Sequence, residues 1–122
     1  MTAHYFRPSN DMPQIYLYRE AVDFRKAVNG LSAIVERELG HNPFDGALYA
    51  FINRRHNKIK CLFWENNGFV LYYKSLAEET FRWPRRGDEV VSLTGQQINW
   101  LLDGYDISLM TGHKKLHYES VF

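Results

Sequence analysis

The spacing of the apolar residues changes at Ala47, and this change limits the possible folds more than any other feature of the sequence. Through residues 24–39, apolar side chains recur every three or four positions, which is the spacing of one face of an α-helix. After Ala47, short apolar runs alternate with polar residues and are separated by turn-forming residues, a pattern typical of β-strands. The sequence therefore predicts a long helix followed by antiparallel strands, an α+β fold.

The long helix is expected over residues 24–39. Asp23 is a candidate N-cap, and Gly40, followed closely by Pro43, provides a stop signal. Gly30 lies inside this helix, where it costs about 1 kcal/mol relative to alanine. We therefore expect a neighbouring element to approach the helix closely at Gly30.

The strands are expected to form an antiparallel β-meander of four or five strands, with the long helix packed on one face. Short links join the three central strands, and Asn67-Gly68 is a strong hairpin signal because such turns require positive φ angles. The three central strands are expected at residues 48–52, 58–64 and 69–74, with 80–83 and 90–93 as candidates for a fourth and a fifth strand. A further short strand is expected ahead of the long helix, at residues 15–18.

A chain of 122 residues is long enough for one domain. A shorter C-terminal helix is expected at about 95–103, between the cap Thr94 and Gly104, closing an edge or an end of the sheet. The ordered core should cover about residues 15–106. Residues 1–12 and 107–122 are expected to be peripheral arms of this single domain, 1–122.

Several classes of function are excluded or disfavoured by residues that the chain lacks. Its one cysteine, Cys61, allows neither an internal disulfide nor a cysteine-based zinc site, and it is expected to be buried in a strand. His113 and His117 have a spacing that can bind a metal, but solvated tail histidines are the alternative and no third ligand is evident. We expect no metal, no cofactor and no enzymatic activity.

Without an apolar run of about 18 residues or a signal peptide, no membrane association is expected, and the predicted location is the cytoplasm.

A nearly neutral total charge conceals a strong local asymmetry. Residues 54–86 contain eight basic and three acidic residues. Arginine and lysine with interleaved aromatic residues suit a nucleic-acid backbone with stacking nearby. The alternative is a hairpin end that solvated arginines keep soluble. The candidate DNA-binding residues in this region are Arg54, Arg55, Lys58, Lys60, Arg82, Arg85 and Arg86.

Arg25 and Lys26 are two further candidates. They are cations at the expected N-terminus of the long helix, where the helix dipole does not favour positive charge. A phosphate bound by the free N–H groups and these side chains would explain them. A simple ion pair between Asp23 and an arginine is the alternative.

Four segments in order carry a resemblance to a known family: residues 23–31, 43–55, 58–84 and 93–104. They include Asp23-Phe24-Arg25-Lys26, Asn53-Arg54-Arg55 and Trp83-Pro84. This arrangement resembles the TnpB-type accessory proteins, encoded by the second reading frame, of the IS-sixty-six group of bacterial insertion sequences. The resemblance covers roughly residues 15–106. It implies a transposition-related protein that lacks a catalytic core, which a separate transposase supplies.

The resemblance and the basic segments together predict a non-enzymatic accessory protein for transposition. It is expected to bind DNA weakly and non-specifically through a basic hairpin face. The alternative is a protein–protein interaction module that assembles with the separate transposase without contacting DNA. Salt-dependent DNA binding distinguishes the two.

Overall fold

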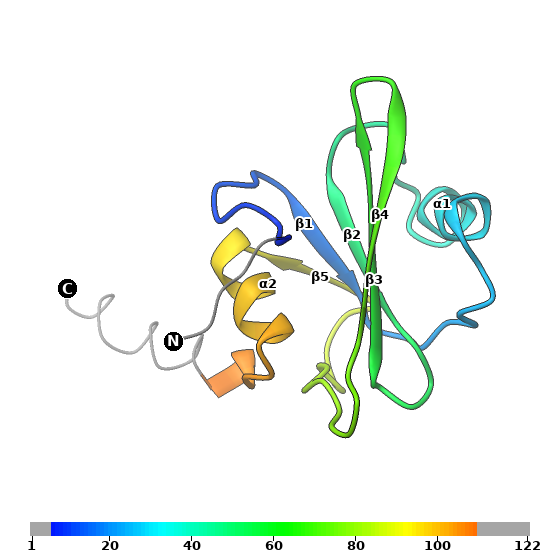
Figure 1. Cartoon of the computed structure of the whole chain (residues 1–122). Helices are drawn as coiled ribbons and strands as arrows, with labels where there is room; N and C mark the ends of the chain where they lie inside the picture. The colour runs from blue at the N-terminus through cyan, green and yellow to red at the C-terminus, as the bar shows by residue number, and fades with distance from the viewer. Residues whose placement is uncertain (1–5, 110–122) are drawn as a thin grey trace.

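Five strands and two main helices make up the structure, a computed structural model that describes residues 6–109. The strands form one sheet in the order β4-β3-β2-β1-β5, and the helices cover its two faces (Figure 1). The predicted α+β class is confirmed. The elements are β1 (Ile15–Tyr18), α1 (Val28–Arg37), β2 (Leu48–Ile52), β3 (Lys58–Glu65), β4 (Gly68–Ser75), β5 (Val90–Leu93) and α2 (Gly95–Leu102).

The predicted antiparallel meander is found in β2, β3 and β4, but the whole sheet is mixed. β1 pairs in parallel with β2, with Ile15 opposite Leu48, and pairs antiparallel with β5 on its other side. The connection from β1 to β2 contains α1, and such a crossover is what a parallel neighbour requires. The β3–β4 hairpin closes over Asn66 and Asn67, and of these two residues only Asn66 has a positive φ, 53°.

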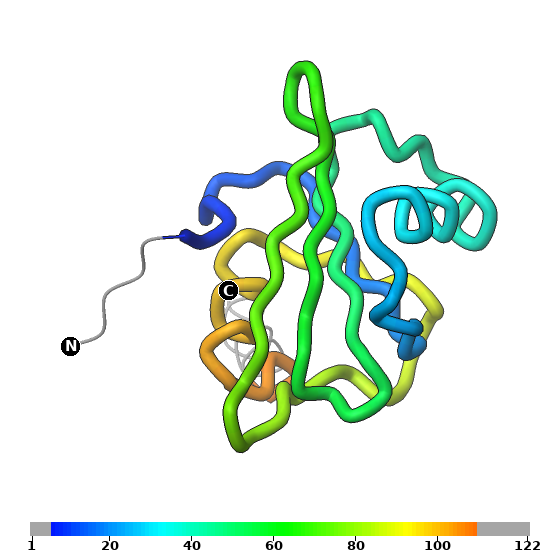
Figure 2. The backbone as a smooth tube through the Cα atoms, turned by 45° about the vertical axis from the view of Figure 1, so that its right-hand side comes forward, coloured from blue at the N-terminus to red at the C-terminus, as the bar shows by residue number. Residues whose placement is uncertain are grey.

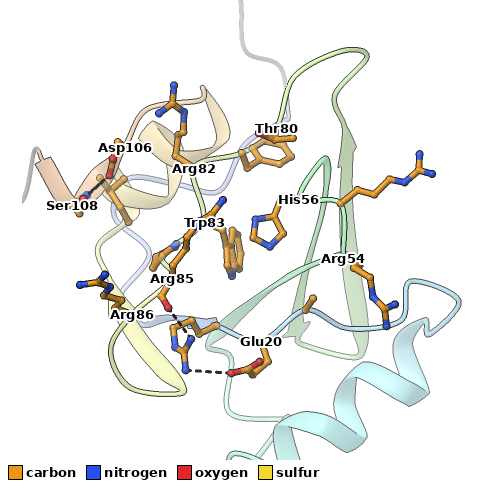
Figure 3. A pocket seen from close by; sticks show the side chains of 16 residues that line it. Glu20, Arg54, His56, Thr80, Arg82, Trp83, Arg85, Arg86, Asp106 and Ser108 are labelled. Carbon is orange, nitrogen blue, oxygen red and sulfur yellow. Dashed lines mark hydrogen bonds and ion pairs between the residues drawn. The ribbon is translucent and has the colours of Figure 1, made fainter.

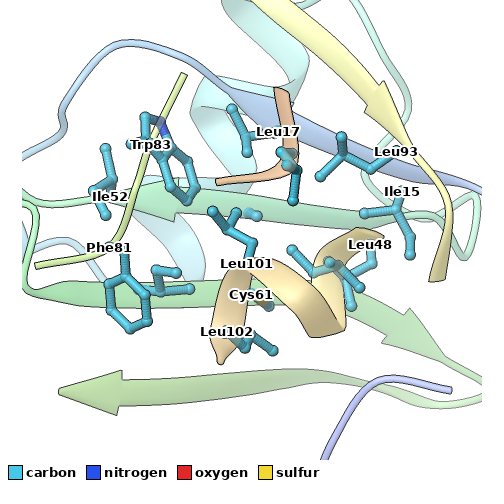
Figure 4. Packing of buried hydrophobic residues seen from close by; sticks show 14 residues of the cluster. Ile15, Leu17, Leu48, Ile52, Cys61, Phe81, Trp83, Leu93, Leu101 and Leu102 are labelled. Carbon is cyan, nitrogen blue, oxygen red and sulfur yellow. The ribbon is translucent and has the colours of Figure 1, made fainter. Parts of the chain in front are cut away.

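The alternation of side chains along the strands gives each face of the sheet its own core. In β2, Leu48 and Ile52 point to the α2 side, whereas Tyr49 and Phe51 point to the α1 side. All five residues of β2 are buried, as expected for a strand covered on both faces. Figure 4 shows Leu101 of α2 packed among residues of the strands. Cys61 lies in this core with no exposed surface, as predicted, and burial raises the pKa of its thiol to about 12.

The long helix begins later than predicted. α1 starts at Val28, and no side chain caps it. The carbonyl oxygens of Phe24 and Lys26 instead accept hydrogen bonds from Lys60 Nζ, at 2.9 and 2.8 Å. A lysine from β3 thus bonds to backbone carbonyl oxygens that would accept helical hydrogen bonds if the helix began earlier. Residues 23–27 therefore form a separate turn.

Two glycines, one within α1 and one after it, have different roles. Gly40 has a φ of +68° and ends the helical region, as predicted. At Gly30, a Cβ atom would lie 2.9 Å from the Cβ of Lys26. The element that approaches Gly30 closely is therefore the turn directly before the helix, and not a distant part of the chain.

Residues 80–83, predicted as a strand, lie outside the sheet. Phe81 and Trp83 are buried, at 2% and 4% exposure, and alternate with exposed neighbours as strand residues do. The Phe81 N–H donates to the His56 carbonyl at 2.7 Å, but no ladder of pairs follows. Burial alternates along residues 80–83 because the rings of Phe81 and Trp83 both cover the α2-side core.

The N-terminal segment, predicted as a peripheral arm, lies against α2 in its described part. Arg7 forms an ion pair with Asp103 at 2.8 Å, and Asn99 Nδ2 donates to the Pro8 carbonyl at 2.8 Å. At the other end, Ile107 is buried in the α2-side core, although the predicted core ended at Asp106. Thr94 caps α2 as predicted. Residues 1–5 and 110–122, including His113 and His117, lie outside the described residues.

Candidate nucleic-acid interface

Two basic segments of the chain, residues 53–60 and 81–86, meet around one pocket of about 960 Å³ at the end of the sheet where β2 turns into β3. The pocket is lined by the β2–β3 turn, the segment around Trp83, the residues after β1 and those after α2. Figure 3 shows Arg54, Arg82 and Arg86 spread around His56 and Trp83. We call this region the arginine pocket. Five of the nine candidate residues line it, all with exposed side chains: Arg54, Arg55, Arg82, Arg85 and Arg86.

The β2–β3 turn presents Arg54 and Arg55 on a backbone that is held by its own side chains. Asn53 Oδ1 accepts from the N–H groups of Asn57 and Lys58, each at 3.0 Å. Asn53 Nδ2 donates to Asn57 Oδ1 at 2.7 Å. These bonds close the turn, so that the two arginines between them project toward solvent.

Arg19 is a sixth arginine of the pocket, and sequence reasoning missed it. Its guanidinium donates to the carbonyl oxygens of Arg85, at 3.1 Å, and Asp88, at 3.2 Å, and pairs with Glu20 at 3.2 Å. Arg19 therefore positions the loop that contains Arg85 and Arg86. Only the folded structure brings it to this loop, and no local pattern in the sequence marks it.

The acidic side chains of the pocket already have partners. Glu20 pairs with Arg19, and Asp106 accepts hydrogen bonds from Ser108 Oγ at 2.6 Å and Ser108 N at 3.1 Å. The hydrogen bond from the Ser108 side chain, assisted by the charge of Arg82, holds the pKa of Asp106 below its usual value. Across residues 6–109, the guanidinium groups of Arg54, Arg55, Arg85 and Arg86 form no ion pair with a carboxylate. The rim of the pocket is thus cationic and available to an anion.

The aromatic residues of the pocket are part of the core and do not offer the stacking surface that the sequence suggested. Trp83 is 4% exposed, and its Nε1 donates to the Tyr18 carbonyl at 3.2 Å. Phe81 is equally buried. The half-buried ring of His56 lies beside Trp83 (Figure 3). Burial, together with the charge of Arg85, lowers the pKa of His56. The geometry favours contacts to phosphates over stacking on bases.

The other four candidates lie outside the arginine pocket. Lys58 lines an adjoining pocket of about 500 Å³, which it shares with Arg54 and Arg55. Lys26 is exposed on the turn before α1, and Lys60 is bound to that turn.

Arg25, the fourth of these candidates, forms the ion pair that was the alternative to phosphate binding. Its NH2 group lies 2.6 Å from Asp23 Oδ2, and its Nε donates to both carboxylate oxygens. The hydrogen bond from Arg25 holds the pKa of Asp23 well below its usual range. A phosphate at this turn would have to compete with a carboxylate already in place.

A different surface lies at the opposite end of the sheet, where the β3–β4 hairpin projects beyond the other strands (Figure 2). The rings of Phe44, Trp64 and Phe69 contact one another there, with centroids 5.0 to 5.3 Å apart. Phe44 is 56% exposed. We call this cluster the aromatic tip. Residues 40–48 and 63–71 around it contain no lysine or arginine, so it differs from the arginine pocket in charge as well as in polarity.

Two features are absent from the part of the chain that the structure describes. Residues 6–109 contain no group of three or more histidine, cysteine, aspartate or glutamate side chains that could hold a metal ion. No helix in the same part of the chain is long and apolar enough to cross a membrane.

One family model matches most of the chain, and two curated proteins are similar to it. The family model described as "IS66 Orf2 like protein" matches residues 13–112. The protein y4jC of Sinorhizobium fredii (strain NBRC 101917 / NGR234) is 29% identical over 93 residues, which cover 76% of this chain and 80% of the relative. The protein y4hO of the same strain is 27% identical over 99 residues, covering 81% and 86% of the two chains. Both relatives are described as uncharacterized proteins. No solved structure matches the chain.

Proposed function

Because the chain belongs to the IS66 Orf2-like family, which implies an accessory role in transposition, we propose that it serves that role by binding DNA through the arginine pocket. It acts without catalysing a reaction. Its ligand is the phosphate backbone of DNA, bound weakly and without sequence preference. The transposase of the same element supplies the chemistry.

The observation that carries this proposal is the gathering of five exposed arginines around one pocket from two separate segments of the chain. Grouped cations repel one another, and here the two carboxylates that line the pocket, Glu20 and Asp106, interact with Arg19 and Ser108. A polyanion relieves that repulsion and releases its own counterions on binding. Contacts of this kind position a protein on DNA but read little sequence, because base reading requires side chains at the groove edges.

The experiment compares two double variants that remove the same charge. Arg54→Ala/Arg85→Ala removes two cations from the arginine pocket, whereas Lys26→Ala/Arg37→Ala removes two exposed cations outside it. Fluorescence anisotropy is measured with labelled duplexes of the element ends and of scrambled sequence. We expect the pocket variant to bind both duplexes about tenfold more weakly and the control to bind as the wild type does. Equal losses in the two variants would contradict the pocket as the binding site.

A second candidate function is assembly with the transposase without DNA, and the aromatic tip is the observation that favours it. Exposed aromatic rings that are held against one another make effective protein contacts, because little side-chain freedom is lost on binding. A pull-down of the transposase in the absence of DNA tests it. Under this reading Phe44→Ser abolishes capture, whereas Tyr105→Ser, which removes another exposed ring (55% exposed), has no effect.

A further inference from the structure

The two edges of the sheet differ in how well they are protected. The edge strand β5 has only four residues, and short edge strands resist pairing with other chains. The other edge strand, β4, has eight residues, with no proline and no acidic side chain. Its one charged residue, Lys74, donates through Nζ to the Leu102 carbonyl at 2.9 Å. Apart from this lysine, β4 carries neither the proline nor the further charged side chains that commonly keep an exposed edge from pairing.

The backbone groups that face outward from β4 follow from its register with β3. Beyond the strand end, the Leu76 N–H donates to the Asn57 carbonyl at 2.9 Å. Because bonding alternates along an antiparallel strand, the even-numbered residues of β4 bond to β3. The N–H and C=O groups of Phe69, Leu71 and Tyr73 therefore point away from the sheet. Within residues 6–109 no backbone hydrogen bond reaches them from the outer side.

The sequence of β4 is complementary to itself in one antiparallel register. When Leu71 is placed opposite Leu71 of a second copy, Phe69 faces Tyr73 and Val70 faces Tyr72. Pairs of aromatic and β-branched residues of this kind stabilise antiparallel strands. Lys74 then faces Gly68, so no like charges meet. This register also places the outward backbone groups of the two strands opposite each other.

We propose that two copies of this chain pair antiparallel through β4, about a two-fold axis beside Leu71, and so join their sheets into one. A two-fold contact uses the same patch on both copies and needs no other partner. Tyr73, which is 51% exposed in the single chain, is covered by this pairing. The proposal is independent of DNA binding, because the arginine pocket includes no residue of β4.

The first test is the mass of the full chain in solution, measured by sedimentation velocity over a range of concentrations. We expect a species of twice the 14.4 kDa of one chain. Tyr73→Pro should abolish it, because proline removes an outward N–H yet is tolerated on an edge strand. Tyr73→Thr removes the same ring but keeps the N–H, and it should still form the dimer. Circular dichroism confirms that both variants are folded.

The second test reads the register itself by disulfide cross-linking under mild oxidation. In the proposed dimer, the Cα atoms of two Leu71→Cys residues lie about 5.5 Å apart, within disulfide range. Two Tyr73→Cys residues lie about 14 Å apart along the strands. The native Cys61 has no exposed surface and should not react.

Leu71→Cys should therefore cross-link readily and Tyr73→Cys should not, although residue 73 is the more exposed of the two. Random collisions would favour the opposite order. A wild-type chain that is monomeric at every concentration, a Tyr73→Pro variant that still dimerises, or faster cross-linking of Tyr73→Cys would each overturn the proposal.

Discussion

Cationic side chains serve two purposes in this protein, and their contacts distinguish them. Lys60 bonds to two backbone carbonyls and lies 4.9 Å from the Phe24 ring centroid, so its charge is used within the fold. Arg54 is exposed and has no carboxylate partner among the described residues. Both belong to the same basic stretch of sequence, and only the structure separates them.

Replacing Lys60 by methionine should lower stability and leave DNA binding unchanged. Lys60→Met keeps the length of the side chain but removes two charge-assisted hydrogen bonds to the turn before α1. We expect the free energy of unfolding, measured with urea, to fall by about 1–3 kcal/mol. Arg54→Met is the matched comparison, with the opposite pattern expected. If Lys60→Met weakens DNA binding as much as Arg54→Met, the structural role assigned to Lys60 is wrong.

His56 should make the stability of the protein depend on pH in the mildly acidic range. Burial first, and then the charge of Arg85, lowers its pKa in the folded state. The unfolded chain then binds a proton at a higher pH than the folded one, so stability is lost as the pH falls below about 6.5.

The His56→Asn variant tests this pH dependence, because asparagine also tolerates the φ of 61° at this position. Thermal melts at pH 7.5 and 5.5 should show a larger decrease in Tm for the wild type than for the variant. Equal decreases would show that His56 does not contribute to the loss of stability in acid.

At the level of elements, α2 and the N-terminal segment fit together at a glycine. A Cβ atom on Gly95 would collide with the backbone carbonyl oxygens of Ser9 and Asn10. Replacing glycine by alanine in a helix ordinarily stabilises it by about 1 kcal/mol. At Gly95 the collision should outweigh that gain.

We therefore expect Gly95→Ala to lower the free energy of unfolding by about 1–3 kcal/mol, the usual cost of overpacking. Gln96→Ala, at the exposed next position of α2, is the control and should have a small effect. Urea unfolding of both variants measures the difference. A Gly95→Ala variant as stable as the wild type would mean that residues 9 and 10 do not lie against α2.

The elements that could be predicted from the sequence are those determined by local patterns. The three strands of the meander, the two stop glycines and the Thr94 cap are examples. The start of α1 could not be predicted, because Lys60, more than thirty residues later in the chain, bonds to its preceding turn. The parallel pairing of β1 with β2 and the position of residues 80–83 also depend on contacts distant in sequence.

At the scale of the whole molecule, the parts of the candidate site that depend on local sequence could be predicted, and the parts that depend on contacts distant in sequence could not. The two basic segments are visible in the sequence, but their meeting around one pocket with Arg19 is a property of the fold. The aromatic tip could not be predicted, because Phe44 lies about twenty residues from Trp64. The result is a protein with a cationic end and an apolar end, separated by the length of the sheet (Figure 1).

The salt dependence of DNA binding is the sharpest test of whether the arginine pocket binds phosphates. If the five exposed arginines of the pocket neutralise four or five phosphates, a plot of log affinity against log salt concentration should have a slope of roughly −3.5 to −4.5. Arg54→Ala/Arg85→Ala should flatten this slope by about 2, whereas Lys26→Ala/Arg37→Ala should leave it unchanged. Absence of binding at low salt, or the same slope in the wild type and the pocket variant, would show that the arginine pocket is not a DNA-binding site.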